Sequence, residues 1–93
     1  MAAAVRRWKV YIVRCADDTL YSGVALDVAR RVAELNGTGK RGARYTRARR
    51  PVTLVYQVSA ANRSAACKRE YAIKQLSRPD KLKLIDRAVR RKR

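Results

Sequence analysis

The sequence predicts a small α+β domain (α/β in the broad sense), with helices packed on one three-stranded sheet. Its 93 residues suit a single compact domain, taken as residues 1–93. Short β-rich stretches alternate between apolar and polar residues, whereas longer stretches place apolar residues at helical spacing behind capping residues. The expected order is β-β-α-β-α-α, and we expect the first two strands to pair antiparallel.

Each expected element depends on a local signal. Asp17 and Asp18 mark a turn between two strands, and Asp27 can cap a helix that Gly37 ends. The third strand is apolar through its middle, which predicts a central place in the sheet. Pro79 suits the first turn of the last helix. The elements are expected over 8–14, 20–25, 28–36, 51–59, 62 or 64 to about 77, and 80 to about 90, with a basic, Gly-rich loop over 37–50.

Charge indicates the partner. The chain has 24 Lys and Arg against 7 Asp and Glu, a net charge of +17, so the domain repels itself and favours a polyanion. The basic residues extend from Arg6 to Arg93 instead of forming one tail. A membrane is the competing polyanion, but no segment is a long apolar helix with one basic face. We therefore expect nucleic acid, DNA ahead of RNA, and no membrane partner; the sequence leaves the oligomeric state open.

The chain has no histidine, which excludes a histidine general base and a zinc site with histidine ligands. Cys15 and Cys67 are far apart and form no C-x-x-C pair, as in reduced thiols of a cytosolic protein. Arg6 and Arg7 come too early for a secretory signal. We therefore expect a cytoplasmic location.

Glu70 is the only acidic residue between Leu35 and Pro79. On a helical wheel it falls at the edge of the buried stripe of its helix. A carboxylate in that position needs a partner, which is a divalent metal ion or a cation such as Lys74. A metal would also let a carboxylate coexist with bound phosphate. Both alternatives stay open.

The first helix separates two neighbouring arginines. Its wheel turns Arg31 toward the sheet edge and Arg30 toward solvent. A fixed guanidinium suits a pentacoordinate phosphate, so Arg31 is the candidate phosphate ligand at that edge.

Tyr11 and Tyr21 lie on the first two strands, where tyrosine is also an ordinary strand former. They share a face only if the hairpin loop has an odd number of residues. A loop of residues 16–18 would pair Tyr11 with Gly23 and Tyr21 with Val13 on one side. The missing side chain at Gly23 would then leave space beside Tyr11 for a ligand.

The loop between Lys40 and Arg50 holds six Lys or Arg among eleven residues. It is expected to clamp the nucleic-acid backbone, with one aromatic ring as a stacking platform. The alternative is a solvated, flexible loop. The candidate nucleic-acid-binding residues are Lys40, Arg41, Arg44, Tyr45 and Arg47.

These segments together resemble the GIY-YIG nuclease superfamily, especially its small stand-alone bacterial members. The resemblance covers about residues 8–80 and leaves a basic tail over about 87–93. The segments that carry it are Lys9-Val10-Tyr11, Tyr21-Ser22-Gly23, Asp27 to Arg31, Gly39 to Thr46 and the helix with Glu70.

The resemblance implies an endonuclease that hydrolyses phosphodiester bonds in DNA, single-stranded or branched, with one divalent metal, Mg²⁺ or Mn²⁺. Glu70 would be the metal ligand and Arg31 would steady the scissile phosphate. Tyr11 or Tyr21 would act as general base or place the attacking water, with the other in support. A metal and nearby guanidinium groups would favour the phenolate form of the tyrosine. The alternatives are a catalytically inert nucleic-acid-binding module and an adaptor in a repair or RNA complex.

The chain departs from the family pattern at three places. Its first motif is Lys9-Val10-Tyr11, without the glycine, and its second is Tyr21-Ser22-Gly23; both keep the tyrosine. Many relatives carry a histidine four residues after the arginine that corresponds to Arg31, and Leu35 stands there instead. Leu35 completes the apolar stripe of its helix, so we expect it in the core. The lost histidine is the feature that favours the inert module; its role could otherwise have passed to Tyr45.

Overall fold

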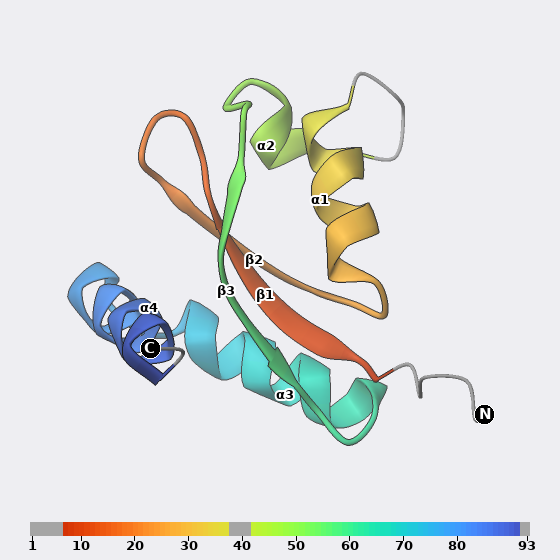
Figure 1. The fold of residues 1–93 in the computed structure, drawn as a ribbon, viewed down its shortest axis with the longest axis vertical. Coiled ribbons are helices and arrows are strands. Elements are labelled where there is room, and N and C mark those ends of the chain that lie inside the picture. The colour runs from red at the N-terminus through yellow and green to blue at the C-terminus, as the bar shows by residue number, and fades with distance from the viewer. Residues whose placement is uncertain (1–6, 38–41, 92–93) are drawn as a thin grey trace.

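The computed structural model describes residues 7–37 and 42–91, and its elements follow the expected order with one addition (Figure 1). The strands are β1 (Lys9–Arg14), β2 (Leu20–Ala25) and β3 (Thr53–Ser59). The helices are α1 (Val28–Asn36), α2 (Arg44–Arg47), α3 (Arg63–Lys74) and α4 (Arg78–Arg91). The addition is α2, one short helix inside the segment that the sequence predicts as loop.

The three strands form one antiparallel sheet in the order β2-β1-β3. The prediction that the third strand is central is therefore wrong. Helices cover both faces of the sheet, and all four residues Val10–Val13 of the middle strand are buried. The edge strand β3 instead exposes Thr53, Gln57 and Ser59. An apolar run signals burial on both faces, and it does not specify which strand has two neighbours.

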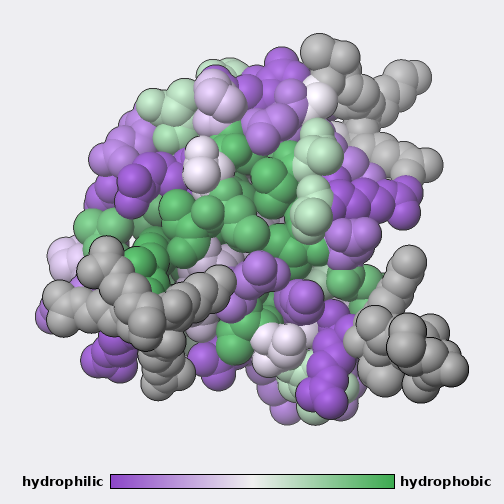
Figure 2. Space-filling view, in the orientation of Figure 1, coloured by the Kyte–Doolittle hydropathy of each residue, from purple (hydrophilic) through white to green (hydrophobic). Residues whose placement is uncertain are grey.

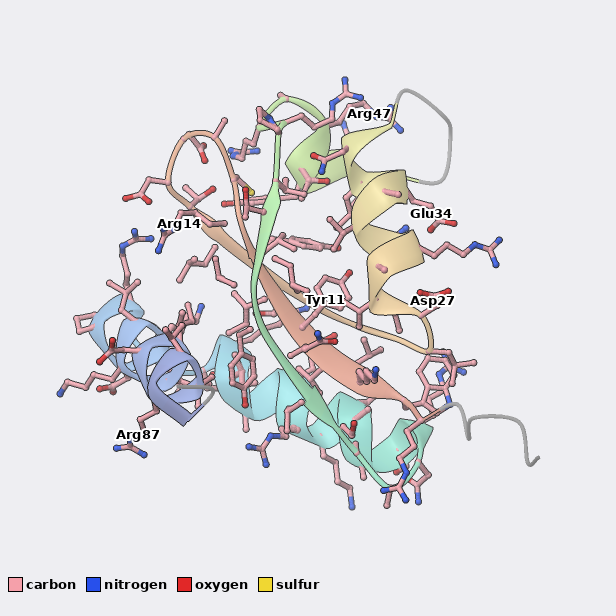
Figure 3. All side chains as sticks on the ribbon, viewed as in Figure 1. Tyr11, Arg14, Asp27, Glu34, Arg47 and Arg87 are labelled. Atoms are coloured by element: carbon pink, nitrogen blue, oxygen red, sulfur yellow. The ribbon has the colours of Figure 1, made fainter. Side chains whose placement is uncertain are left out.

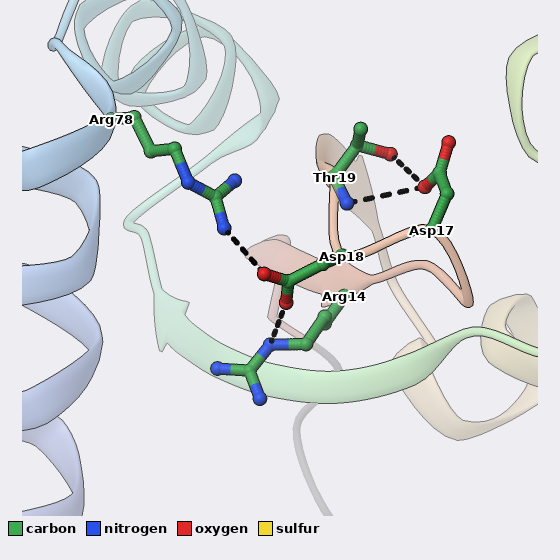
Figure 4. A network of polar contacts seen from close by, with 5 residues as sticks. All are labelled: Arg14, Asp17, Asp18, Thr19 and Arg78. Carbon is green, nitrogen blue, oxygen red and sulfur yellow. Dashed lines mark hydrogen bonds and ion pairs between the residues drawn. The ribbon is translucent and has the colours of Figure 1, made fainter.

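A tight turn joins β1 and β2. The Cys15 amide donates to the Thr19 carbonyl (2.8 Å), and Asp18 adopts a left-handed φ of 67°, as in common three-residue hairpin loops. The carboxylate of Asp18 lies 3.5 Å from Arg14 Nε and 3.1 Å from Arg78 Nη2 (Figure 4). The second ion pair connects the turn to the first residue of α4.

The hairpin register follows from this three-residue loop. Tyr11 pairs with Gly23, and Val13 pairs with Tyr21. Both tyrosines consequently lie on the α1 side of the sheet, in the same packed cluster. The sequence prediction for an odd loop is confirmed.

Side-chain caps begin two of the helices. Asp27 Oδ1 accepts from the Arg30 amide at 3.1 Å, and Asn62 Oδ1 accepts from the Ala65 amide at 2.8 Å. The first helix has the predicted bounds. The helix α3 ends at Lys74, earlier than predicted, and α4 begins two residues before its predicted start.

Two hydrophobic clusters lie on opposite faces of the sheet. Figure 1 shows α1 on one side of the sheet and α3 and α4 on the other. The face toward α1 buries Tyr11, Val13, Cys15, Val28, Leu35 and Val52. The face toward α3 and α4 buries Val10, Ile12, Tyr56, Ala66, Ile73 and Ile85. Figure 2 shows hydrophobic side chains reaching the surface over β3, where the two clusters meet the free edge of the sheet. Within residues 7–37 and 42–91, no helix has the length and apolar character needed to cross a bilayer.

One asparagine connects the end of α1 to the start of β3. The Asn36 amide nitrogen donates to the Val52 carbonyl (3.0 Å), and its oxygen accepts from the Val52 amide (2.6 Å). Thr46 of α2 is fully buried and donates to the Ala43 carbonyl (3.1 Å). The Asn36 bonds join the two ends of the basic segment, and α2 packs against α1.

Candidate active site

Tyr11 is at the centre of the candidate site. Its side chain lies between the sheet and α1 and is only 1% exposed (Figure 3). Its hydroxyl is hydrogen-bonded to the guanidinium of Arg31. Across β2, a Cβ on Gly23 would come within 2.6 Å of Tyr11 Cζ. The absence of a side chain at Gly23 therefore makes the space that the phenol ring itself occupies. The expectation that this space is open to a ligand is wrong, because the Tyr11 ring fills it.

The two arginines of α1 separate as predicted. The Arg31 side chain is 25% exposed and points to Tyr11, whereas that of Arg30 is 63% exposed. Glu34 accepts from Arg31 at 3.1 Å and lies 3.5 Å from Arg30. Burial acts to lower the pKa of Arg31, but hydrogen bonds with Tyr11 and Glu34 raise it overall, so the guanidinium stays charged.

The pKa of Tyr11 is raised above its ordinary value of 10.0. Burial is the main cause, and the charges of Tyr21 and Glu70 add to it. The hydrogen bond from Arg31 opposes the rise without cancelling it. The Arg31 guanidinium does favour the phenolate, as expected, but desolvation outweighs it, so without a metal the pKa of Tyr11 is raised overall.

Tyr21 connects this centre to the basic segment. Its ring stacks on that of Tyr45, with 5.7 Å between centroids and 17° between planes. The guanidinium carbon of Arg49 lies 4.1 Å from the Tyr45 centroid, close enough for a cation–π contact. Tyr45 is 40% exposed, so this row of side chains begins in the buried centre and reaches the surface.

Glu70 lies on α3, which packs against β2 and β1. Its side chain is 20% exposed, in agreement with a place at the edge of the buried stripe, and Lys74 Nζ lies 3.0 Å from its Oε1. The ion pair expected as the alternative to a metal is thus present. The carboxylate is also near enough to Tyr11 for its charge to raise the pKa of the phenol.

Whether this site can hold a divalent metal ion depends on which side chains are available as ligands. In the described ranges, no three residues of the His, Cys, Asp and Glu types lie together as a ready-made metal cluster. One carboxylate is nevertheless compatible with Mg²⁺, which keeps several waters and binds through one or two carboxylates with substrate phosphate. Glu70 fits that limited requirement. Its pairing with Lys74 means that a metal would have to displace or share the ammonium's position.

Three predicted nucleic-acid-binding residues lie in or on α2. Arg44, Tyr45 and Arg47 are exposed, and Arg47 is seen beside the end of α1 (Figure 3). Lys40 and Arg41 lie outside the described residues. The structure therefore places three of the five candidates on one small basic surface next to Tyr21.

Three residues of this region were not among the candidate site residues predicted from the sequence. Glu34 could have been recognised, because it stands three residues after Arg31 and four after Arg30, where helix side chains meet. Arg49 and Asp17 are 32 positions apart and had no such signal, yet Arg49 Nε donates to Asp17 Oδ2 at 3.0 Å.

Comparison with known proteins gives a consistent result. The model of the GIY-YIG catalytic domain matches residues 7–83. A UPF0213 protein of Desulfotalea psychrophila is 59% identical over 78 residues, covering 84% of this chain and 70% of that protein. A UPF0213 protein of Staphylococcus haemolyticus is 52% identical over 77 residues, covering 83% and 92%.

A solved structure shows the same fold. The solution NMR structure of the UPF0213 protein BH0048 from Bacillus halodurans superposes with a TM-score of 0.55 at 36% identity, covering 86% of this chain and 83% of that one. The paired tyrosine motifs, the arginine of α1 and the glutamate of α3 all fall inside the matched range. This chain belongs to the GIY-YIG family.

Proposed function

We propose that this protein is a divalent-metal-dependent endonuclease that hydrolyses phosphodiester bonds in DNA, acting in the cytoplasm. The observation that carries the proposal is the hydrogen bond between the buried Tyr11 hydroxyl and Arg31, inside a matched catalytic domain. The phenol can act on the attacking water while the guanidinium binds the phosphate that the water attacks, because the two groups lie together beside a basic surface.

Arg31 has the geometry of a phosphate ligand. Glu34 and Tyr11 hold its guanidinium in place, so little side-chain entropy is lost when a phosphate binds. Its charge would stabilise the extra negative charge of the pentacoordinate phosphate. Tyr11 or Tyr21 would accept the proton of the attacking water or orient that water, and the other would support it.

Glu70 would hold the one Mg²⁺ or Mn²⁺ ion. When bound, the ion supplies positive charge close to the scissile phosphate. It would also oppose the desolvation that keeps Tyr11 protonated. The α3 helix matters to this role because it supplies a carboxylate in a chain whose net charge is +17.

The substrate we propose is DNA in single-stranded or branched form. Arg44, Tyr45 and Arg47 would contact its backbone and one base, together with Lys40 and Arg41. Such contacts are insensitive to sequence, and a domain this small has little surface for base readout. Selectivity would then come from substrate shape.

The test is cleavage of single-stranded, duplex and branched DNA, and of RNA, with Mg²⁺ or Mn²⁺ or neither. Glu70→Gln should abolish cleavage while binding is retained or strengthened, because a negative charge leaves the phosphate path. Lys74→Gln is the matched control: it breaks the same ion pair but keeps the carboxylate, so cleavage should persist.

The opposite pattern supports a second candidate function, an inert nucleic-acid-binding module or adaptor. It is favoured by two observations: Leu35 fills the place of the family histidine, and Glu70 already has a cation partner. In that case the wild type cleaves nothing with either metal. Glu70→Gln and Lys74→Gln would then have the same small effect on stability and none on binding.

A further inference from the structure

Arg49 makes a concentrated set of contacts close to the candidate tyrosines. Its Nη1 donates to the Tyr45 carbonyl at 2.7 Å, and its guanidinium also lies over the Tyr45 ring. On the other side, its Nε donates to Asp17 and its own carbonyl accepts from the Ala16 amide at 2.9 Å. One residue thus joins α2 to the turn between β1 and β2.

The acceptor at the turn is itself held in place. Asp17 Oδ1 accepts from the Thr19 hydroxyl (2.6 Å) and the Thr19 amide (3.1 Å), as Figure 4 shows, which leaves Oδ2 for Arg49. The hydrogen bond from Thr19 lowers the pKa of Asp17, with a further contribution from Arg49. The carboxylate is therefore charged and oriented at neutral pH.

Tyr45 needs such an external support. The helix α2 has only four residues, Arg44–Arg47, and a single turn is not stable by its own backbone hydrogen bonds. Its N-cap residue, Ala43, supplies no side-chain cap. Nevertheless the Tyr45 ring is nearly parallel to that of Tyr21, one of the two candidate catalytic tyrosines.

We propose that Arg49 is a positioning residue, which holds Tyr45 against Tyr21 and so fixes the orientation of Tyr21 beside Tyr11. Arginine suits this task and lysine does not. A planar guanidinium stacks on a ring while its separate N–H groups reach Asp17 and a carbonyl, whereas an ammonium is a single point charge. The kinetic consequence rests on the proposed nuclease function; the ordering of the two rings does not.

The test uses the full chain with Arg49→Ala, Arg49→Lys and Asp17→Asn. Arg87→Ala on α4 is the control, because it removes one exposed positive charge away from this row of rings. The first readout is the set of ring-proton NMR shifts of Tyr21 and Tyr45 in the free protein. The second is the separation of kcat and KM for DNA cleavage.

Both Arg49 variants should move the ring shifts of Tyr21 and Tyr45 toward unstacked values and lower kcat by about 10- to 100-fold, with little change in KM. Asp17→Asn should give a smaller change of the same kind. It also serves if Arg49→Ala does not fold, since it alters only an exposed group. Arg87→Ala should leave ring shifts and kcat unchanged.

Two results would overturn the proposal. Ring shifts that stay the same in the Arg49 variants would mean that Arg49 orders neither ring. Full activity in Arg49→Lys, with a salt-dependent rise of KM in Arg49→Ala, would mean that Arg49 supplies only charge for phosphate binding. If the wild type cleaves no nucleic acid, the proposed nuclease function fails, while the ring shifts still decide whether Arg49 orders the tyrosines.

Discussion

The phenol of Tyr11 occupies the space that a side chain on Gly23 would need. The two residues pair across β1 and β2, and a Cβ at Gly23 would meet the hydroxyl and Cζ of Tyr11. Since the ring is buried and bonded to Arg31, it has little room to move. This relationship makes the second motif's glycine a requirement of the site's geometry.

Gly23→Ala should therefore destabilise the fold by about 1–3 kcal/mol, as overpacking of a close-packed interior does. It should also displace the Tyr11 hydroxyl from Arg31 and reduce cleavage. Urea denaturation measures the first effect, and a cleavage assay the second. A Gly23→Ala protein with wild-type stability and activity would show that the ring is not confined.

A double-mutant cycle identifies the clash. Removing the hydroxyl by Tyr11→Phe takes away the atom nearest to the added methyl group. Gly23→Ala should then cost less in the Tyr11→Phe background than in the wild type, with a coupling of about 1 kcal/mol. Additive effects would place the strain elsewhere.

The raised pKa of Tyr11 predicts an alkaline loss of stability. Below pH 10 the phenol is protonated in both states, so its contribution is fully present. As pH rises above 10, the unfolded state ionises first and the folded state is penalised, until the pH passes the folded pKa. Metal-free Tyr11→Phe should consequently lose less stability than wild type between pH 8 and pH 11 in urea denaturation.

The control for this comparison is Tyr71→Phe, because Tyr71 is an exposed residue of α3. It should follow the wild-type pH dependence. Tyr11→Phe also loses the hydrogen bond to Arg31, which changes the free energy of unfolding at every pH. The quantity to compare is therefore the change in the free energy of unfolding from pH 8 to pH 11. If that change is the same for Tyr11→Phe and wild type, the raised pKa of Tyr11 is contradicted.

The burial of Leu35 predicts that replacing it with the histidine of the family will not restore that residue's function. Leu35 is 1% exposed and packs in the cluster of Tyr11, Val28 and Val52. Leu35→His would bury a polar ring without a prepared partner and lose apolar packing, at a cost of about 2–5 kcal/mol. Leu35→Met keeps volume and should cost less than about 1.5 kcal/mol.

Thermal or urea denaturation of both Leu35 variants checks this, together with their cleavage rates. Leu35→His should not increase cleavage at a temperature where it stays folded. An active, stable Leu35→His protein would mean that the histidine's place is open in this chain and that α1 can turn to present it.

Neutralising Lys40, Arg41, Arg44 and Arg47 together should weaken binding to all DNA sequences alike. The slope of log affinity against log salt should flatten by about 0.7–0.9 for each phosphate that the protein no longer neutralises. Fluorescence anisotropy over a salt series, with two unrelated sequences of equal length, measures both. Weaker binding to only one of the two sequences would contradict a backbone clamp.

Local signals were enough for much of the fold. Asp27 and Gly37 bound α1 at the predicted residues, since a cap depends on a few neighbouring atoms. The sequence predicted the hairpin register except for one alternative, whether the loop has an odd or an even number of residues. The three-residue turn that ends at Asp18 decides this. The position of β3 at the edge was not predictable, because strand order depends on contacts between distant segments.

The candidate site divides in the same way. Periodicity separated Arg31 from Arg30 and placed Glu70 at a core edge, because each is a property of one helix. The short α2 was missed, since its four residues have too little periodicity to stand out from a basic loop. The raised pKa of Tyr11 needed its burial, which no sequence motif specifies.

By itself, the sequence determined that this is a basic, histidine-free α+β chain with paired tyrosine motifs, a helix arginine and one isolated carboxylate. Each of these features follows from composition or from residues that are close together in the sequence. Only the tertiary structure decided that Tyr11 fills the gap at Gly23 and that Tyr21 stacks on Tyr45. It also decided that Arg49 reaches Asp17 across 32 positions, because the packing of the whole chain brings these groups within bonding distance.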